Sequence, residues 1–190
     1  NIKKFVDILT SLSNNQETIN ELLEIYQNTI TIMPGNKSPE FVNYENHSGG
    51  YNSLSDYIGK YVYIDVWATW CGPCIREIPF FEEVQKEFQN KNIEFISISI
   101  DDRNRPLYNY DKWMEYVKDE KLSGIHLFAD NAWNSEFIKS YNINSIPRYL
   151  LIDNKGFIIS ADASRPSDKS LINQINSLKH INCNEENCVI

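Results

Sequence analysis

The chain has little of what a membrane or nucleic-acid-binding protein needs. No apolar run approaches the ~18–20 residues of a membrane-spanning helix. The 18 Lys and Arg residues are outnumbered by 26 Asp and Glu, the formal charge is −8, and there is no basic cluster. Neither nucleic acid nor an anionic membrane surface is therefore an expected partner. The three histidines, His47, His126 and His180, form no recognisable ligand set, and we expect no metal and no other cofactor.

The chain also has no signal peptide and no initiator methionine, since it begins at Asn1. We therefore expect a processed or trimmed product, whose leader or membrane anchor would not be visible in this sequence. Internal repeats and low-complexity tracts are missing as well. The 190 residues are 42% hydrophobic and 13% aromatic, which suits one packed α/β domain with an extension.

Hydrophobic spacing divides the chain into three parts. Residues 1–39 contain two amphipathic stretches, which predict a helical N-terminal extension packed on the domain or on an upstream part. We interpret it as structural rather than as a partner-binding element. Residues 40–182 alternate strand and helix patterns, which predict one α/β domain with a mixed central sheet and helices on both faces. Residues 183–190 are a tail that contains Cys183 and Cys188.

Individual elements of the domain follow from local patterns. Apolar runs without alternating polarity, typical of strands covered on both faces, stand at 61–67 and 93–100. The polar segment 41–57 predicts turns and a short helix rather than strands. The other expected strands lie at 125–129, 148–152 and 157–160, and the other expected helices follow residue 74, span 107–119 and 134–141, and follow residue 168.

The stretch that carries chemistry is Trp70-Cys71-Gly72-Pro73-Cys74, placed where a strand ends and a helix begins. The unpaired N–H groups and partial positive charge of a helix N-terminus favour a thiolate. Cysteines in such positions have pKa values of roughly 3.5–7.5 rather than ~8.5, thioredoxin being one of the known examples. The spacing predicts a reversible dithiol–disulfide pair, although a metal half-site or a permanent disulfide uses the same pattern.

A second pair, Cys183 and Cys188, lies among acidic residues, which should raise thiol pKa values and discourage thiolate chemistry. We expect a small structural disulfide or two loose thiols there. The alternative is a second exchange pair that passes electrons to Cys71 and Cys74. This tail and His180 are also the only further ligands for a zinc site, and their distance along the chain favours redox chemistry over metal binding.

Two carboxylates accompany the first pair. Asp65 interrupts an apolar strand, where burial is costly unless the group is paired or protonated. We interpret Asp65 as the proton acceptor for Cys74, the alternative being a carboxylate satisfied at a strand end. Glu77, one helical turn after Cys74, either tunes the cysteine pair or stabilises the first turn of the helix through its charge.

Several blocks of the sequence carry a family resemblance. They are Leu54-Ser55-Asp56-Tyr57, Asp65 to Cys74, Glu77 with Pro79, Ile146-Pro147, and Leu151 to Gly156. Together they resemble the thioredoxin superfamily, and most nearly the TlpA-like (ResA-like) thiol-disulfide oxidoreductases. The resemblance covers about residues 40–180. It implies a thioredoxin-like fold, with an extra helix and strand inserted between roughly Asp101 and Phe128.

The resemblance also implies roles for individual residues. Cys71, the more exposed cysteine, attacks the disulfide of a protein substrate, and Cys74 resolves the mixed disulfide. A cis peptide at Ile146-Pro147 would lie beside the cysteines and present its backbone to an extended substrate segment. The expected substrate-binding residues are Trp70, Gly72, Pro73, Ile146 and Pro147.

The sequence thus predicts an enzyme, a thiol-disulfide oxidoreductase that reduces disulfides of extracytoplasmic proteins in the bacterial periplasm. Its second partner would be an upstream electron-donor protein. The Gly-Pro dipeptide and Asp65 favour a reductase over an oxidase. The alternative is a non-catalytic thioredoxin-fold module that binds a metal or a partner through the cysteines. A peroxidase is disfavoured because Ala68 and Cys71 stand where the peroxiredoxin pattern requires threonine.

Overall fold

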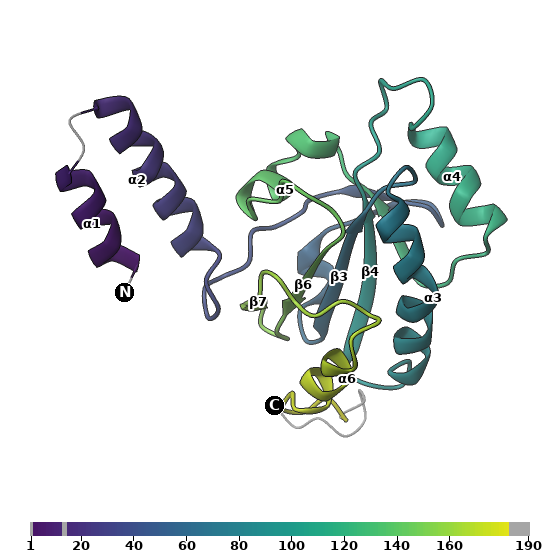
Figure 1. Cartoon of the computed structure of the whole chain (residues 1–190). Helices are drawn as coiled ribbons and strands as arrows, with labels where there is room; N and C mark the ends of the chain where they lie inside the picture. Colours follow the sequence, from purple (N-terminus) through teal and green to yellow (C-terminus); the bar gives the residue numbers. More distant parts are fainter. Residues whose placement is uncertain (1, 13–14, 183–190) are drawn as a thin grey trace.

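The structure is a computed structural model that describes residues 2–12 and 15–182. Its strands are β1 (Tyr44–Asn46), β2 (Tyr51–Asn52), β3 (Tyr61–Trp67), β4 (Ile93–Ser99), β5 (Ile125–Phe128), β6 (Arg148–Ile152) and β7 (Ile158–Ser160). In the described chain they form one seven-stranded sheet in the order β2-β1-β5-β4-β3-β6-β7. β3 and β4 are parallel, as are β4 and β5, and the other neighbours are antiparallel. The expected mixed central sheet is confirmed (Figure 1).

Helices lie on both faces of this sheet, as expected (Figure 1). The helices of the described chain are α1 (Ile2–Leu12), α2 (Gln16–Thr31), α3 (Gly72–Glu87), α4 (Tyr110–Asp119), α5 (Glu136–Ser140) and α6 (Lys169–Asn176), with short 3₁₀ helices at Leu54–Tyr57 and Ala132–Asn134, and those from α3 onward cover the sheet (Figure 1). α3 and α6 pack on one face through Phe81 and Leu171. α5 covers the other face, where the Phe137 ring meets the Phe41 ring with centroids 5.4 Å apart.

The central strand β3 determines where the cysteine motif lies. Every residue of β3 is buried, because its alternate side chains enter the two different cores. Val62 and Ile64 face the core on the α5 side, and Tyr63 faces the core beneath α3 and α6. Such double burial explains why the run does not alternate between apolar and polar residues, with Asp65 as its one charged member. The strand ends at Trp67, and the chain reaches α3 within a few residues.

The two expected N-terminal helices are present, but they are not packed on the domain. α1 contacts α2, and α2 buries none of its residues (Figure 1). Attachment comes from the segment that follows, where Ile32 packs against the core and the Gly35 N–H donates to the Ile158 carbonyl at 2.8 Å. None of the described helices is both long and apolar enough to cross a membrane.

The structure differs from the predicted elements in two ways: it contains short strands in a segment predicted to have none, and some of its helices begin later or are shorter than predicted. The polar segment 41–57 contains β1 and β2, and β1 joins the sheet by pairing with β5. The helix expected at 107–119 begins at Tyr110, because the Asn109 side chain caps it by accepting from the Lys112 N–H. The helix expected at 134–141 is a 3₁₀ turn followed by the shorter α5.

Candidate active site

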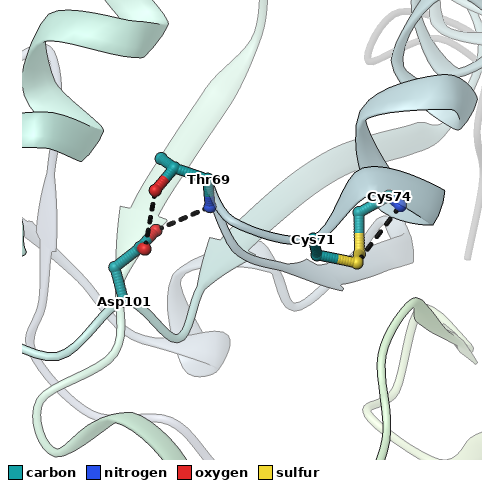
Figure 2. The surroundings of a disulfide bond; sticks show 4 residues. All are labelled: Thr69, Cys71, Cys74 and Asp101. Atoms are coloured by element: carbon teal, nitrogen blue, oxygen red, sulfur yellow. Dashed lines mark hydrogen bonds between the residues drawn. A yellow bond between two sulfur atoms is a disulfide. The ribbon is translucent and has the colours of Figure 1, made fainter. Parts of the chain in front are cut away.

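Cys71 and Cys74 lie where β3 gives way to α3, and they form a disulfide with Cα atoms 5.2 Å apart. Cys71 is the N-cap of α3, and its Sγ accepts a hydrogen bond from the Cys74 backbone N–H at 3.2 Å (Figure 2). Gly72 and Pro73 form the start of the helix, where Pro73 needs no N–H partner. The helix terminus therefore directs both a hydrogen bond and its partial positive charge at the Cys71 sulfur, which favours a thiolate when the disulfide is reduced.

The two sulfur-bearing residues differ slightly in accessibility. Cys71 is 4% exposed and Cys74 is 1% exposed, so a reagent reaches Cys71 first. The neighbouring Trp70 is 37% exposed, and its ring centroid lies 6.5 Å from that of Trp133. Trp67, in contrast, is 1% exposed and belongs to the core. Trp70 and Trp133 therefore form an aromatic pair beside the cysteine motif, whereas Trp67 packs in the core.

An acid that sequence reasoning missed anchors the turn between β3 and Cys71. Asp101 is fully buried, and its carboxylate accepts from the Thr69 N–H at 3.0 Å and the Thr69 hydroxyl at 2.8 Å (Figure 2). It also accepts from the Ser99 hydroxyl at 2.8 Å. The sequence signal was an acid directly after the apolar run 93–100. Asp101 holds the turn that carries Cys71 in one position.

We expect Asp101→Ala to destabilise the oxidised protein by about 2–4 kcal/mol, because buried donors on Thr69 and Ser99 lose their acceptor. Disulfide exchange should slow as the turn loosens. Chemical denaturation and a disulfide-reduction assay measure the two effects. The matched control is Asp102→Ala, a more exposed neighbour whose removal should cost less than ~1 kcal/mol. Equal losses from both variants would show that Asp101 does not anchor the turn.

Asp65 lies on β3, on the face covered by α3. It is 5% exposed, and its Oδ1 has no hydrogen-bond partner among the described residues. Burial raises the pKa of Asp65 to about 8, and the negative charge of Glu77 adds to the increase. Asp65 is therefore not satisfied at a strand end, and the carboxyl group holds its proton at neutral pH.

Glu77 does not lie in the first turn of a helix, because α3 begins at Gly72. That interpretation of Glu77 is wrong. The buried carboxylate instead accepts from the Ser167 N–H at 3.0 Å and the Ser167 hydroxyl at 2.9 Å, with the Arg165 Nη1 at 3.8 Å. Glu77 thus joins α3 to the loop before α6, and places a negative charge near Asp65.

The peptide bond between Ile146 and Pro147 is cis. It precedes β6, whose first residue, Arg148, pairs with Val66 of β3 in the antiparallel register. Pro147 therefore lies beside the end of β3 from which the cysteine motif emerges. The cis peptide and the disulfide therefore lie at the same end of the neighbouring strands β3 and β6.

The C-terminal pair Cys183 and Cys188 lies outside the described residues. Across residues 2–12 and 15–182, no group of three His, Cys, Asp or Glu side chains could hold a metal ion.

Comparisons with known proteins agree on one family. The Redoxin family model matches residues 33–175. The thioredoxin-like protein YneN of Bacillus subtilis is 33% identical over 135 residues, covering 68% of this chain and 71% of the relative. Thiol-disulfide oxidoreductase ResA of Geobacillus thermodenitrificans is 25% identical over 159 residues, covering 82% and 86%. The crystal structure of a Bacteroides vulgatus protein assigned as a thiol-disulfide oxidoreductase superposes with a TM-score of 0.68 and 33% identity, covering 77% of this chain and 97% of that one.

Proposed function

This chain belongs to the Redoxin family and is a thioredoxin-like oxidoreductase of the TlpA/ResA type, and we propose that it reduces protein disulfides through Cys71 and Cys74. The observation that carries the proposal is the Cys71–Cys74 disulfide at the N-terminus of α3, with a helix N–H directed at the Cys71 sulfur. Its homologues imply that it interacts with disulfide-bearing substrates and with redox partners.

The proposed reaction moves two electrons to the substrate. The Cys71 thiolate attacks one substrate sulfur, forming a mixed disulfide and releasing the other substrate sulfur as a thiolate. Cys74 then loses its thiol proton and attacks the Cys71 sulfur. This step re-forms the Cys71–Cys74 disulfide and releases the second substrate thiolate.

The ionised form of Asp65, which is the minority form at neutral pH because burial raises the pKa to about 8, is the proposed acceptor of the Cys74 proton. Cys74 and Ile78 are four residues apart on α3, so both face the same side of the helix. Ile78 and Asp65 line one cavity between α3 and the sheet. A carboxyl group with a pKa raised to about 8 is a far stronger base than an ordinary carboxylate and is close to a thiol in proton affinity.

The proposed substrate contacts lie around the sulfur of Cys71. The backbone beside the cis peptide at Ile146-Pro147 would pair with an extended substrate segment, which gives recognition without a fixed sequence. Trp70 would cover the segment from one side. The proposed substrate-binding residues are Trp70, Gly72, Pro73, Ile146 and Pro147. Glu77 has a different proposed role: its negative charge helps to raise the pKa of Asp65 and so tunes the reactivity of the cysteine pair.

We place the reaction in an extracytoplasmic compartment, the bacterial periplasm, with an upstream electron-donor protein that returns the pair to its dithiol form. The TlpA/ResA relationship supports the compartment. The Gly-Pro dipeptide between the cysteines supports the reducing direction. The separation into residues 1–39, 40–182 and 183–190 also remains part of the proposal.

The test is a redox titration of the purified chain, followed by mass spectrometry of the Cys71–Cys74 pair. We expect a reduction potential nearer that of thioredoxin, about −270 mV, than that of the oxidant DsbA, about −120 mV. A potential close to the oxidant would reverse the proposed direction. A stoichiometric bound metal, with no turnover on a disulfide substrate, would favour a binding module instead.

A further inference from the structure

A row of polar side chains crosses the sheet beneath α3. The strand register pairs Tyr149 of β6 with Asp65 of β3, Asp65 with Ser97 of β4, and Ser97 with His126 of β5. Paired residues in a sheet point to the same face, so all four side chains lie on the α3 side. All four are at least nine-tenths buried. A continuous buried polar row is unusual in a core and calls for polar partners.

Three polar atoms in this row lack partners among the described residues, and one of them is the Tyr149 hydroxyl. Among the described residues, neither Asp65 Oδ1 nor His126 Nδ1 has a hydrogen-bond partner. His126 Nε2 lies 3.0 Å from the Ser123 carbonyl oxygen, which can only accept, so Nε2 carries the proton in that contact. In the neutral ring Nδ1 is therefore an acceptor. Burial lowers the pKa of His126, which keeps the ring neutral.

Both side chains face one cavity. Asp65, Ser97 and His126 line it from the sheet, and Ile78 and Glu82 line it from α3. Its volume is about 10 Å³, which is at the lower limit for one water molecule. A buried water needs about two to four polar partners, and the sheet residues alone supply three.

The cavity also reaches toward the surface. Ser123 lines its outer end, is exposed, and donates its backbone N–H to the Glu82 carboxylate at 3.2 Å. A proton that leaves Asp65 through this space would emerge near a surface carboxylate. The remaining lining residues are Trp67, Phe81 and Leu122.

We propose that the cavity holds one structural water that joins Asp65 to His126 Nδ1, and that this water is the route by which Asp65 exchanges its proton with solvent. The inference rests on the proposed function. Asp65 takes the proton of Cys74 during resolution, and it must release that proton before the next cycle. The carboxyl group gives its proton to the water, and the water passes a proton to the Glu82 carboxylate that lines the same cavity, from which it exchanges with solvent. The hydrogen bond from the water to His126 Nδ1 holds the water in place, and the ring stays neutral. No electrons move in this step, and His126 acts as a positioning residue.

The titratable groups that face this path come from several elements. Around Asp65 they are Glu77 of α3, Tyr63 of β3 and Tyr149 of β6. Around His126 they are Glu82 of α3 and His47, which follows β1. Ser97→Val and His126→Leu keep all five of these groups, so a change in rate is assigned to the cavity.

The water itself is tested by a high-resolution crystal structure of the full chain. We expect a water within hydrogen-bond distance of both Asp65 and His126 Nδ1. Ser97→Val adds methyl groups that fill the cavity and should expel the water, whereas Ser97→Ala preserves the space and should retain it. An empty wild-type cavity would overturn the proposal.

The proton route is tested by multiple-turnover reduction of a disulfide peptide at neutral pH, with dithiothreitol regenerating the dithiol, in H₂O and in D₂O. Ser97→Val and His126→Leu should slow turnover by about tenfold and increase the solvent isotope effect, since proton release between cycles becomes limiting. Ser97→Ala should fall between them and the wild type. A purely structural role for Ser97 would change stability without changing the isotope effect.

Two results would separate this proposal from the proposed function. If Ser97→Val and His126→Leu remain folded by circular dichroism and react like the wild type, the route is wrong and the function stands. If the wild-type chain does not reduce disulfides, the proposed function fails, and the crystallographic water still tests the site. His126→Gln serves as the second variant if His126→Leu does not fold.

Discussion

A Cys74→Ser variant should accumulate a stable mixed disulfide between Cys71 and its substrate protein, and its steady-state turnover should fall by at least ~10³-fold. The attacking residue remains intact, because the hydrogen bond to the Cys71 sulfur comes from the backbone N–H of residue 74 and survives the substitution. The resolving thiol is gone, so the first step occurs and the second does not. Non-reducing electrophoresis detects the adduct, and peptide mapping locates the bonded sulfur.

The matched control for this trapping experiment is Cys71→Ser, which keeps Cys74 and should trap nothing. Cys74 is 1% exposed beneath the first turn of α3, so it is poorly placed to attack a protein. An adduct on Cys74 in the control would reverse the two roles. An adduct on Cys183 or Cys188 in the Cys74→Ser variant would show that the C-terminal pair, rather than Cys71, meets the substrate.

The parts of the fold that were predicted from the sequence are those whose signal is local and strong. The strand at 61–67 is buried on both faces, so its side chains are apolar except for Asp65. The cysteine motif could be placed because the run at 61–67 predicts a strand directly before it and the apolar spacing after Cys74 predicts a helix directly after it. β1 and β2 were missed because strands of two or three residues carry no periodic pattern.

The parts of the site that were missed depend on tertiary contacts. The partner of Glu77 is Ser167, from the loop before α6, and no local spacing indicates such a contact. Asp101 reaches Thr69 only because β4 ends beside β3. His126 formed no recognisable ligand set in the sequence, and its position opposite Ser97 required the strand register.

Asp65 connects the stability of the fold to its proposed chemistry. An unpaired buried carboxyl group is a poor choice for stability, since it costs free energy whenever it ionises. The same burial raises its pKa toward that of a thiol, which a proton acceptor for Cys74 requires. A residue that destabilises the fold while serving the reaction is expected at a functional site.

Asp65→Asn should therefore stabilise the oxidised protein at pH 7 by about 2–4 kcal/mol. The pKa of Asp65 is about 8 in the folded protein, against an ordinary value of 3.8. Between these values the folded chain keeps a proton that the unfolded chain has lost. The free energy of unfolding of the wild type must then fall as pH rises, by up to ~1.4 kcal/mol per pH unit. Asparagine cannot ionise, so the variant should lack this slope.

The measurement is denaturant unfolding of the oxidised wild type and variant at several pH values from 4 to 9. Their difference isolates Asp65 from every other titrating group. Asp119→Asn, at the exposed end of α4, is the matched control and should change stability by less than ~0.5 kcal/mol. Disulfide reduction by Asp65→Asn should fall by about 10²-fold, because the base is lost. A wild type and variant whose stabilities differ equally at pH 4 and pH 8 would show that Asp65 keeps its ordinary pKa in the folded chain, and it would then be too weak a base to take the Cys74 proton.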